Sequence, residues 1–192
     1  MLLKKFVNLS FLLICLSVSA LGSLVIHAKL KHMARESIIH EWNKVDVEVP
    51  KTAPEWNQES VDVAMAMYGI KTPSHVKVPV FDPNLEDRGV TIMNGWGQKL
   101  LVKVGPAAFE SWALLGSTLA HEIEIHCEQS FLLIRLLDSV GFSGTLSAER
   151  EAYMHEIVNK DRFHLSEFEI DNIRNTMNYF YPDENEEGLS AK

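Results

Sequence analysis

One stretch of the chain carries the residue types of a hydrolytic metal site. Residues 117–129 contain the pattern His121-Glu122-x-x-x-His126, and an acidic segment that begins at Glu149 follows it. Zinc binds imidazole nitrogen and carboxylate oxygen, and two imidazoles with one carboxylate leave a fourth position on the ion for water. A further carboxylate beside that water can take its proton, because zinc lowers the pKa of the water. The residue types therefore predict a zinc centre that activates water.

The spacing of the two histidines sets a condition on the helix that carries them. Histidine ligands on one helix are usually four residues apart, which separates them by about 40° around the axis. His121 and His126 are five residues apart, which corresponds to about 140° on a regular α-helix. A π-type bulge absorbs one extra residue, and such bulges occur preferentially at functional sites. The spacing therefore predicts a bulge between His121 and His126 that brings both imidazoles to one side.

Helices and a small sheet are expected before this segment. Residues 34–42 form a possible short helix, and apolar residues recur with helical spacing over residues 58–68. Residues 75–81 alternate between apolar and polar and contain a proline, which predicts an edge strand. Residues 89–93 and 99–104 are β-prone and flank an Asn-Gly loop, which predicts a hairpin.

The remainder of the chain is expected to be helical. Residues 107–140 read as strongly helical, with Gly116 as the one weak point, where a new helix can begin. Two further helices are predicted over residues 147–163 and 166–179, the second with a capping box. A small antiparallel sheet followed by a helical half indicates an α+β fold rather than a parallel βαβ fold.

The pattern resembles a known class of zinc metallopeptidases, the gluzincins. There a His-Glu-x-x-His helix supplies two ligands and a base, and a later helix supplies a glutamate ligand. The dipeptidyl peptidase III type has one extra residue between its histidines, as His121-Glu122-Ile-Glu-Ile-His126 does here. Its later motif also places alanine three residues after the glutamate ligand, as in Glu149-Arg-Glu-Ala152. The resemblance is limited to about residues 117–153.

This resemblance implies a zincin-like helical half and a role for each residue of the pattern. His121, His126 and Glu149 would bind one zinc ion, and Glu122 would be the catalytic base. The substrate would be an extended peptide or protein segment, paired with an exposed edge of the predicted hairpin, on either of its two strands.

Two residues of the later helix, Tyr153 and Glu151, leave open which groups orient the histidines and which carboxylate is the third ligand. Gluzincins often place an acidic residue four positions after the glutamate ligand, where it orients a histidine, and here that position is Tyr153. Glu151 is an alternative third ligand. Glu149 is favoured because it lies near the start of its helix, with Tyr153 one turn further on.

The chain begins with a segment that is typical of export. Lys4 and Lys5 precede the uncharged residues 6–28, in which small residues cluster towards the end. Residues 1–28 are therefore interpreted as a signal peptide cleaved to leave a mature start within residues 21–29, or as an uncleaved membrane anchor. Either reading places the remaining chain outside the cytoplasm, in the periplasm or secreted, with any membrane contact made through residues 6–28.

Length and composition indicate a single globular domain at residues 29–182, followed by a flexible acidic tail at residues 183–192. Hydrophobic residues make up 46% of the chain and charged residues 23%, which excludes a disordered or fibrous protein. The net charge of −8 argues against a nucleic-acid partner. Cys127 is the only cysteine outside the N-terminal segment, so no intrachain disulfide is expected in the mature protein.

Two other functions compete with an exported zinc metallopeptidase. Glu122 and His126 are four residues apart and can form a surface pair on a helix. The chain would then be a non-catalytic exported helical binding module with a structural His/Glu cluster. Alternatively, the metal site is real and the enzyme hydrolyses a substrate other than a peptide.

Overall fold

The computed structural model describes residues 48–93 and 98–183, all of which belong to one compact unit. The segment at residues 1–28, the expected helix at 34–42, the tip of the hairpin and the tail beyond Asp183 lie outside the described residues. Among the residues that are described, no helix has the length and apolar character needed to cross a membrane. The predicted α+β class is confirmed.

The sheet has three short strands in the order β1-β3-β2. These are β1 (Val80–Phe81), β2 (Gly89–Ile92) and β3 (Leu101–Val104). The predicted hairpin is confirmed, since β2 and β3 pair antiparallel. The sheet is nevertheless mixed, because β1 pairs parallel with β3. β3 is the central strand: it pairs with β2 on one side and with β1 on the other, and β1 and β3 run in the same direction. Most of the expected strand at residues 75–81 is irregular.

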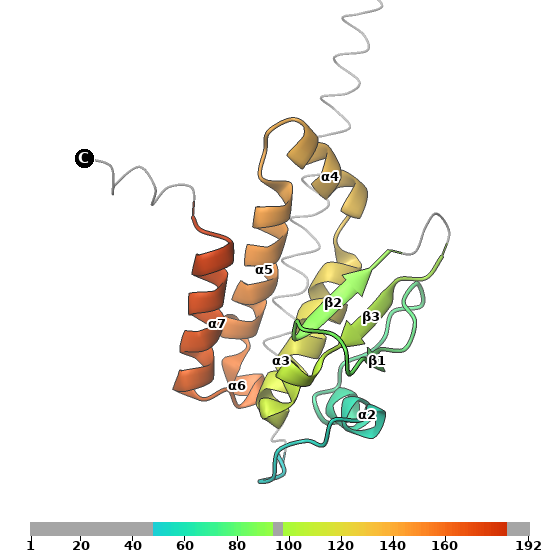
Figure 1. The fold of residues 1–192 in the computed structure, drawn as a ribbon, viewed down its shortest axis with the longest axis vertical. Coiled ribbons are helices and arrows are strands. Elements are labelled where there is room, and N and C mark those ends of the chain that lie inside the picture. The colour runs from blue at the N-terminus through green and yellow to red at the C-terminus, as the bar shows by residue number, and fades with distance from the viewer. Residues whose placement is uncertain (1–47, 94–97, 184–192) are drawn as a thin grey trace, which may run out of the picture. The chain divides into compact units, whose positions relative to one another are not determined.

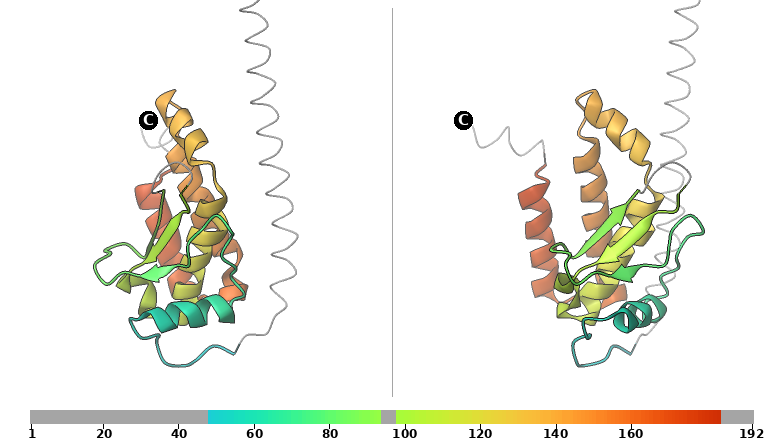
Figure 2. Two further views of the ribbon diagram at one scale, coloured as in Figure 1. Left: turned by 90° about the vertical axis from the view of Figure 1, so that its right-hand side faces the viewer. Right: turned by 45° about the vertical axis from the view of Figure 1, so that its right-hand side comes forward.

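Helices form most of the rest of the described unit (Figure 1). They are α2 (Gln58–Met67), α3 (Trp112–Ala120), α4 (Phe131–Ser139), α5 (Gly144–Val158), α6 (Lys160–Phe163) and α7 (Glu167–Phe180), with 3₁₀ turns at Pro106–Glu110 and His126–Glu128 and a π turn at His121–Ile125. The helix α3 lies between the sheet and α5, and α7 packs on α5. The helix α2 contacts both α3 and β1 at one end of this arrangement (Figure 2).

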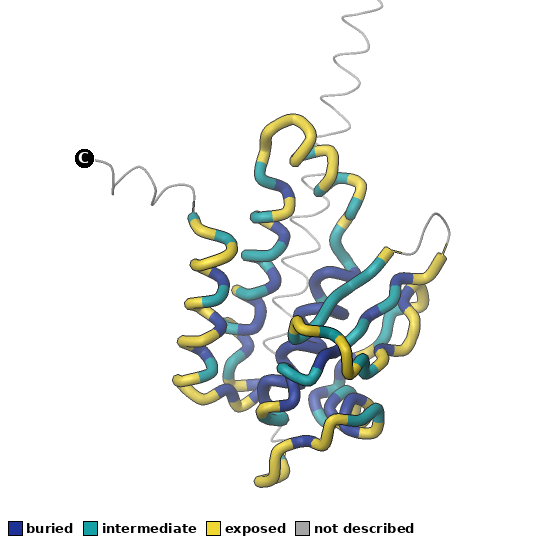
Figure 3. Tube along the Cα trace, viewed as in Figure 1, coloured by how far each residue is buried: buried dark blue, intermediate teal, exposed yellow. Residues whose placement is uncertain are grey.

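The helix α3 is the centre of the core. Every residue of α3 after Trp112 is buried, whereas α4 has no buried residue (Figure 3). Gly116 lies inside α3 and starts no new helix, which corrects the sequence-based expectation. The ring of Tyr68 packs so closely on Gly116 that a Cβ atom there would lie 2.3 Å from it. The glycine therefore allows α2 and α3 to approach each other.

The expected helical run over residues 107–140 is divided into several pieces. The side chain of Ser111 caps α3 by accepting a hydrogen bond from the Leu114 N–H. At the other end, Gln129 is extended and Ser130 caps α4. The following helix begins at Gly144, three residues before the position expected from the sequence, and a break at Asn159 separates α5 from α6. The capping box of α7, formed by Ser166 and Glu169, is confirmed.

Candidate metal centre

The helix that carries the two histidines contains the predicted π turn. It covers His121–Ile125, directly after α3. The backbone N–H of His126 donates to the carbonyl oxygen of His121, five residues back, as well as to that of Glu122. This bonding absorbs the extra residue between the histidines. The predicted bulge between His121 and His126 is therefore confirmed.

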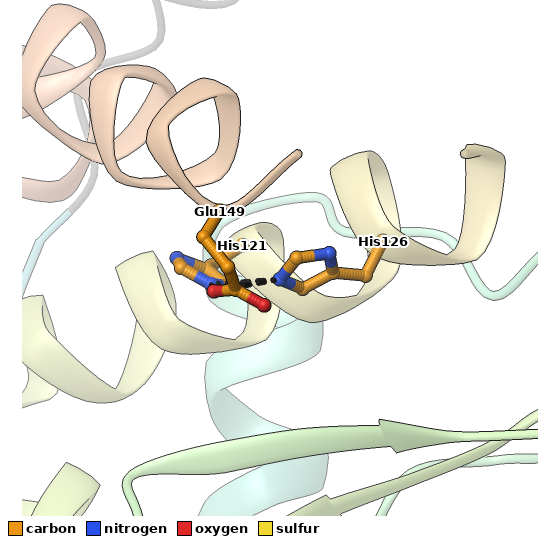
Figure 4. A group of neighbouring side chains, drawn as sticks. All are labelled: His121, His126 and Glu149. Atoms are coloured by element: carbon orange, nitrogen blue, oxygen red, sulfur yellow. Dashed lines mark hydrogen bonds and ion pairs between the residues drawn. The ribbon is translucent and has the colours of Figure 1, made fainter. Parts of the chain in front are cut away.

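The π turn brings the two imidazoles together with Glu149. The Nε2 atoms of His121 and His126 are 3.1 Å apart. An oxygen of Glu149 on α5 lies 3.5 Å from Nε2 of His126 and 3.9 Å from Nε2 of His121. Figure 4 shows the three side chains turned towards one another. One ligand atom from each lies within 4.8 Å of the others, so the three residues converge as the sequence predicted.

His121 is oriented by a carboxylate that the sequence analysis did not identify. Its Nδ1 atom lies 2.8 Å from Oε1 of Glu156 on α5. Glu156 is fully buried and also accepts hydrogen bonds from Ser117 and from both terminal nitrogens of Arg88. Tyr153, at the position where gluzincins often carry an acidic residue, makes a T-shaped ring contact with the imidazole of His121. The orienting carboxylate is therefore present, one helical turn further along α5.

His126 is oriented by Gln129, whose amide is itself held by α5. Nδ1 of His126 lies 2.8 Å from Oε1 of Gln129. The Nε2 group of Gln129 donates to the carbonyl oxygen of Ala148 and to Glu151. Glu151 therefore supports His126 through Gln129, and Glu149 is the carboxylate that faces the cluster.

These hydrogen bonds define which ring nitrogens carry protons. Glu156 is ionised, because burial, which raises its carboxyl pKa, is outweighed by the Arg88 charge and the His121 and Ser117 hydrogen bonds, which lower it to about 2. It can only accept a hydrogen bond, so Nδ1 of His121 must donate. Because both amide donors of Gln129 face oxygen atoms, its Oε1 accepts from Nδ1 of His126. In the neutral imidazoles both Nε2 lone pairs therefore point into the cluster.

Two lone pairs at this distance require a positive charge between them. A tetrahedral zinc ion with bonds of about 2.0–2.1 Å would place two ligand nitrogens about 3.3 Å apart, close to the observed 3.1 Å. Without a metal ion, a proton on Nε2 of His126 can supply this charge. Burial lowers the pKa of His126, but the contact with Glu149 and the charges of Glu122 and Glu149 raise it to about 9. The donor atoms and their spacing fit a divalent metal ion, which would take the place of that proton.

Glu122, the predicted base, is held by the edge strand of the sheet. Thr91 on β2 donates from Oγ1 to Oε2 of Glu122 at 2.8 Å and also lies 3.2 Å from its carbonyl oxygen. Glu122 is only 4% exposed. A Cβ atom at Gly89 would lie 2.8 Å from both Cγ and Oε1 of Glu122. The glycine therefore leaves the space that this carboxylate occupies.

A cleft of about 780 Å³ opens over the cluster. It lies between β2, the π turn, α5 and α7. Its lining includes the following residues: Arg88, Gly89, Val90, Thr91, Leu114, His121, Glu122, His126, Glu149, Tyr153, Glu156, Ile173 and Tyr181. The predicted metal ligands, the predicted base and the edge strand therefore share one solvent-accessible space.

No family model, curated protein or solved structure matches this chain. The resemblance to gluzincins thus rests on the residue pattern of the chain alone.

Sequence reasoning missed Glu156, Gln129 and Thr91. Glu156 lies seven residues after Glu149, two helical turns along the same face, so helical periodicity could have identified it. Thr91 gives no comparable signal, because its contact with Glu122 is made across 31 residues of sequence.

Proposed function

We propose that this protein is an exported zinc-dependent metallopeptidase. The observation that carries the proposal is the 3.1 Å approach of the His121 and His126 Nε2 atoms across the π turn. The π turn and the two orienting hydrogen bonds aim both lone pairs at one point, where Glu149 adds a carboxylate oxygen. A surface His/Glu pair would need none of these features. The arrangement therefore favours a metal centre over a structural cluster.

The ligands and the bound metal would divide the chemistry between them. A bound zinc ion would polarise a carbonyl oxygen and lower the pKa of water towards neutrality. His121, His126 and Glu149 would hold it, and Glu156 and Gln129 would keep the imidazoles in the tautomer that binds metal. Three protein ligands leave a coordination position open to the cleft.

Glu122 would move the proton. Its carboxylate accepts a proton from a water molecule in the cleft while the oxygen of that water attacks the carbonyl carbon of the substrate. Because Thr91 holds Oε2, Oε1 is the oxygen that takes the proton. Glu122 then passes the proton to the amine nitrogen as the carbon–nitrogen bond breaks, and it returns to its ionised form.

The edge strand supports a peptide as the substrate. An extended peptide can pair its main chain with an exposed strand edge, which gives affinity without requiring a particular side chain. β2 is an edge strand, and Gly89, Val90 and Thr91 line the cleft. Of the two strands of the hairpin, β2 is therefore the one proposed to bind substrate, since β3 is paired on both sides.

Metal content and peptide cleavage together test this proposal. The purified protein should contain one zinc ion per chain and His126→Ala should contain none. Cleavage of a peptide library, followed by mass spectrometry, should stop when zinc is removed by a chelator and resume when zinc is restored. Zinc binding with hydrolysis of esters but not peptides would identify a different hydrolase. A protein that binds no metal would instead be the non-catalytic binding module.

Export rests on the N-terminal segment and has its own test. Residues 1–28 combine two lysines with an uncharged run, as signal peptides do. N-terminal sequencing of the mature protein should find a start within residues 21–29. Recovery of Met1 in the membrane fraction would identify residues 6–28 as an anchor.

A further inference from the structure

The π turn contains a second acidic residue, Glu124, whose carboxylate is bound by Arg162 and His155. Arg162 on α6 binds its carboxylate with two nitrogens, at 2.9 Å to Oε2 and 2.8 Å to Oε1. His155 on α5 lies 3.1 Å from the same Oε2 atom. Glu124 is thus the one residue of the turn whose side chain is tied to both α5 and α6.

The guanidinium of Arg162 is itself fixed in place. Arg162 is only 6% exposed. One of its terminal nitrogens also donates to the carbonyl oxygen of Tyr68 at the end of α2, at 2.9 Å. Its guanidinium lies over the ring of Phe163, 4.9 Å from the centroid. The partner of Glu124 therefore cannot follow the helix if the helix changes its register.

His155 adds a second fixed contact. It is 8% exposed, and its carbonyl oxygen accepts a hydrogen bond from Asn159 at the end of α5. The same helix carries Glu149 and Glu156, which contact the two histidines. One helix, α5, therefore contacts both Glu124 and the histidines of the π turn.

A π turn is rare because regular α-helical bonding is normally preferred. If the turn took up regular α-helical bonding, the residues after it would rotate by about 100° relative to those before it. A rotation that begins between His121 and Glu124 would take Glu124 away from Arg162 and His126 away from His121 together. Separating Glu124 from Arg162 leaves the charge of the buried guanidinium uncompensated, which is strongly unfavourable. The ion pair therefore penalises the regular α-helical register.

We propose that Glu124, held by Arg162 and His155, is a positioning residue that keeps the π turn and thereby places the His121 and His126 side chains together. This inference rests on the proposed metal centre only for its metal-binding readout. Glu124 acts through the backbone of the turn and is not a metal ligand. The π turn that the five-residue spacing of the histidines requires is thus stabilised by contacts of one of its own residues.

Two variants and one control test the inference in the full-length protein. Glu124→Gln removes the charge, and Arg162→Lys keeps the charge but cannot form the two parallel hydrogen bonds. Lys103→Met breaks the Lys103–Asp82 ion pair, 2.8 Å long, between β3 and the segment after β1. Co²⁺ serves as the probe, because its visible absorption reports the number and geometry of its ligands.

Both Glu124→Gln and Arg162→Lys should bind Co²⁺ about 10–100-fold more weakly, the range for residues that support metal ligands. Their absorption spectra should also change, whereas Lys103→Met should keep the wild-type affinity and spectrum. Unchanged affinity and spectrum in both variants would overturn the inference. If Glu124→Gln fails to fold, the milder Arg162→Lys decides the outcome.

A crystal structure of metal-free Arg162→Lys gives a readout that does not need metal binding. The π turn should relax towards α-helical bonding, and the two Nε2 atoms should move apart. An intact π turn with the imidazoles still together would contradict the inference. A wild-type protein that binds no Co²⁺ would overturn the proposed function, and the crystal structure would then decide this inference alone.

Discussion

Nδ1 of His121 lies 2.8 Å from Oε1 of Glu156, and this contact determines how the imidazole faces the cleft. Because Nδ1 of His121 carries a proton that it donates to the buried carboxylate, Nε2 is the nitrogen that can bind a metal ion. Glu156 is also paired with Arg88, which immediately precedes the edge strand β2. One buried carboxylate therefore connects a ligand of the proposed metal centre to the segment that leads into the proposed substrate-binding strand.

Glu122→Gln should separate metal binding from catalysis. The glutamine keeps an oxygen that can accept the Thr91 hydrogen bond, so the fold and zinc content should be retained. Peptide hydrolysis should fall by about 10²–10⁴-fold, the range for a positioned general base. The measurement is kcat on a cleaved peptide, with zinc content determined on the same sample. Full activity in this variant would exclude Glu122 as the base.

Glu149→Ala and Glu151→Ala form a matched pair on α5. Glu149→Ala should empty the site, because it removes an oxygen that faces both Nε2 atoms. Glu151 acts through Gln129, so its loss should weaken zinc binding by at most about 10–100-fold. Zinc titration against a competing chelator measures both. If Glu151→Ala were the variant that emptied the site, the third ligand would have to be reassigned.

Glu156→Gln should weaken the site through His121 rather than through direct contact with metal. Without the carboxylate charge, the imidazole loses its strongest orienting partner and Arg88 loses its counter-charge. Zinc affinity should fall by about 10–100-fold. Glu110→Gln provides a control, because Glu110 lines the same cleft and is exposed. Equal zinc affinities in the two variants would contradict the orienting role.

Gly89→Ala should disturb the base without affecting the ligands. The new methyl group would lie 2.8 Å from Cγ and Oε1 of Glu122, so the carboxylate must shift. A misplacement of this kind can reduce the rate about 10²-fold, while zinc content should not change. In a Glu122→Gln background the same substitution should cause little further loss, since both act on one group. Independent, additive losses would show that Gly89 has another role.

The stability of the metal-free protein should fall at alkaline pH. The pKa of His126 is raised from 6.5 to about 9 in the folded protein. Its protonation therefore stabilises the fold fully below pH 6.5, and this contribution is lost as the pH rises through 9. The loss should be about 3 kcal/mol. Thermal unfolding with a chelator present measures it, and His126→Gln should show a flatter profile. A wild-type profile that is equally flat would contradict the charged His126–Glu149 contact.

Local sequence patterns determined much of the site and part of the fold. The five-residue spacing of His121 and His126 has one helical solution that brings the rings together, and the π turn adopts it. The capping box of Ser166 and Glu169 depends on residues three positions apart. The hairpin also follows from neighbouring residues. In each case the interacting groups are close in sequence, so spacing alone specifies the geometry.

Only the tertiary structure determined which distant residues hold Glu122 and Glu124 in place. Thr91 reaches Glu122, and Arg162 reaches Glu124, across 31 and 38 residues of sequence. The parallel pairing of β1 with β3 likewise depends on where the chain passes between them. Such contacts depend on how helices and strands pack, which no local pattern encodes. The tertiary structure thus adds to the spacing of the histidines the distant contacts that hold their turn in place.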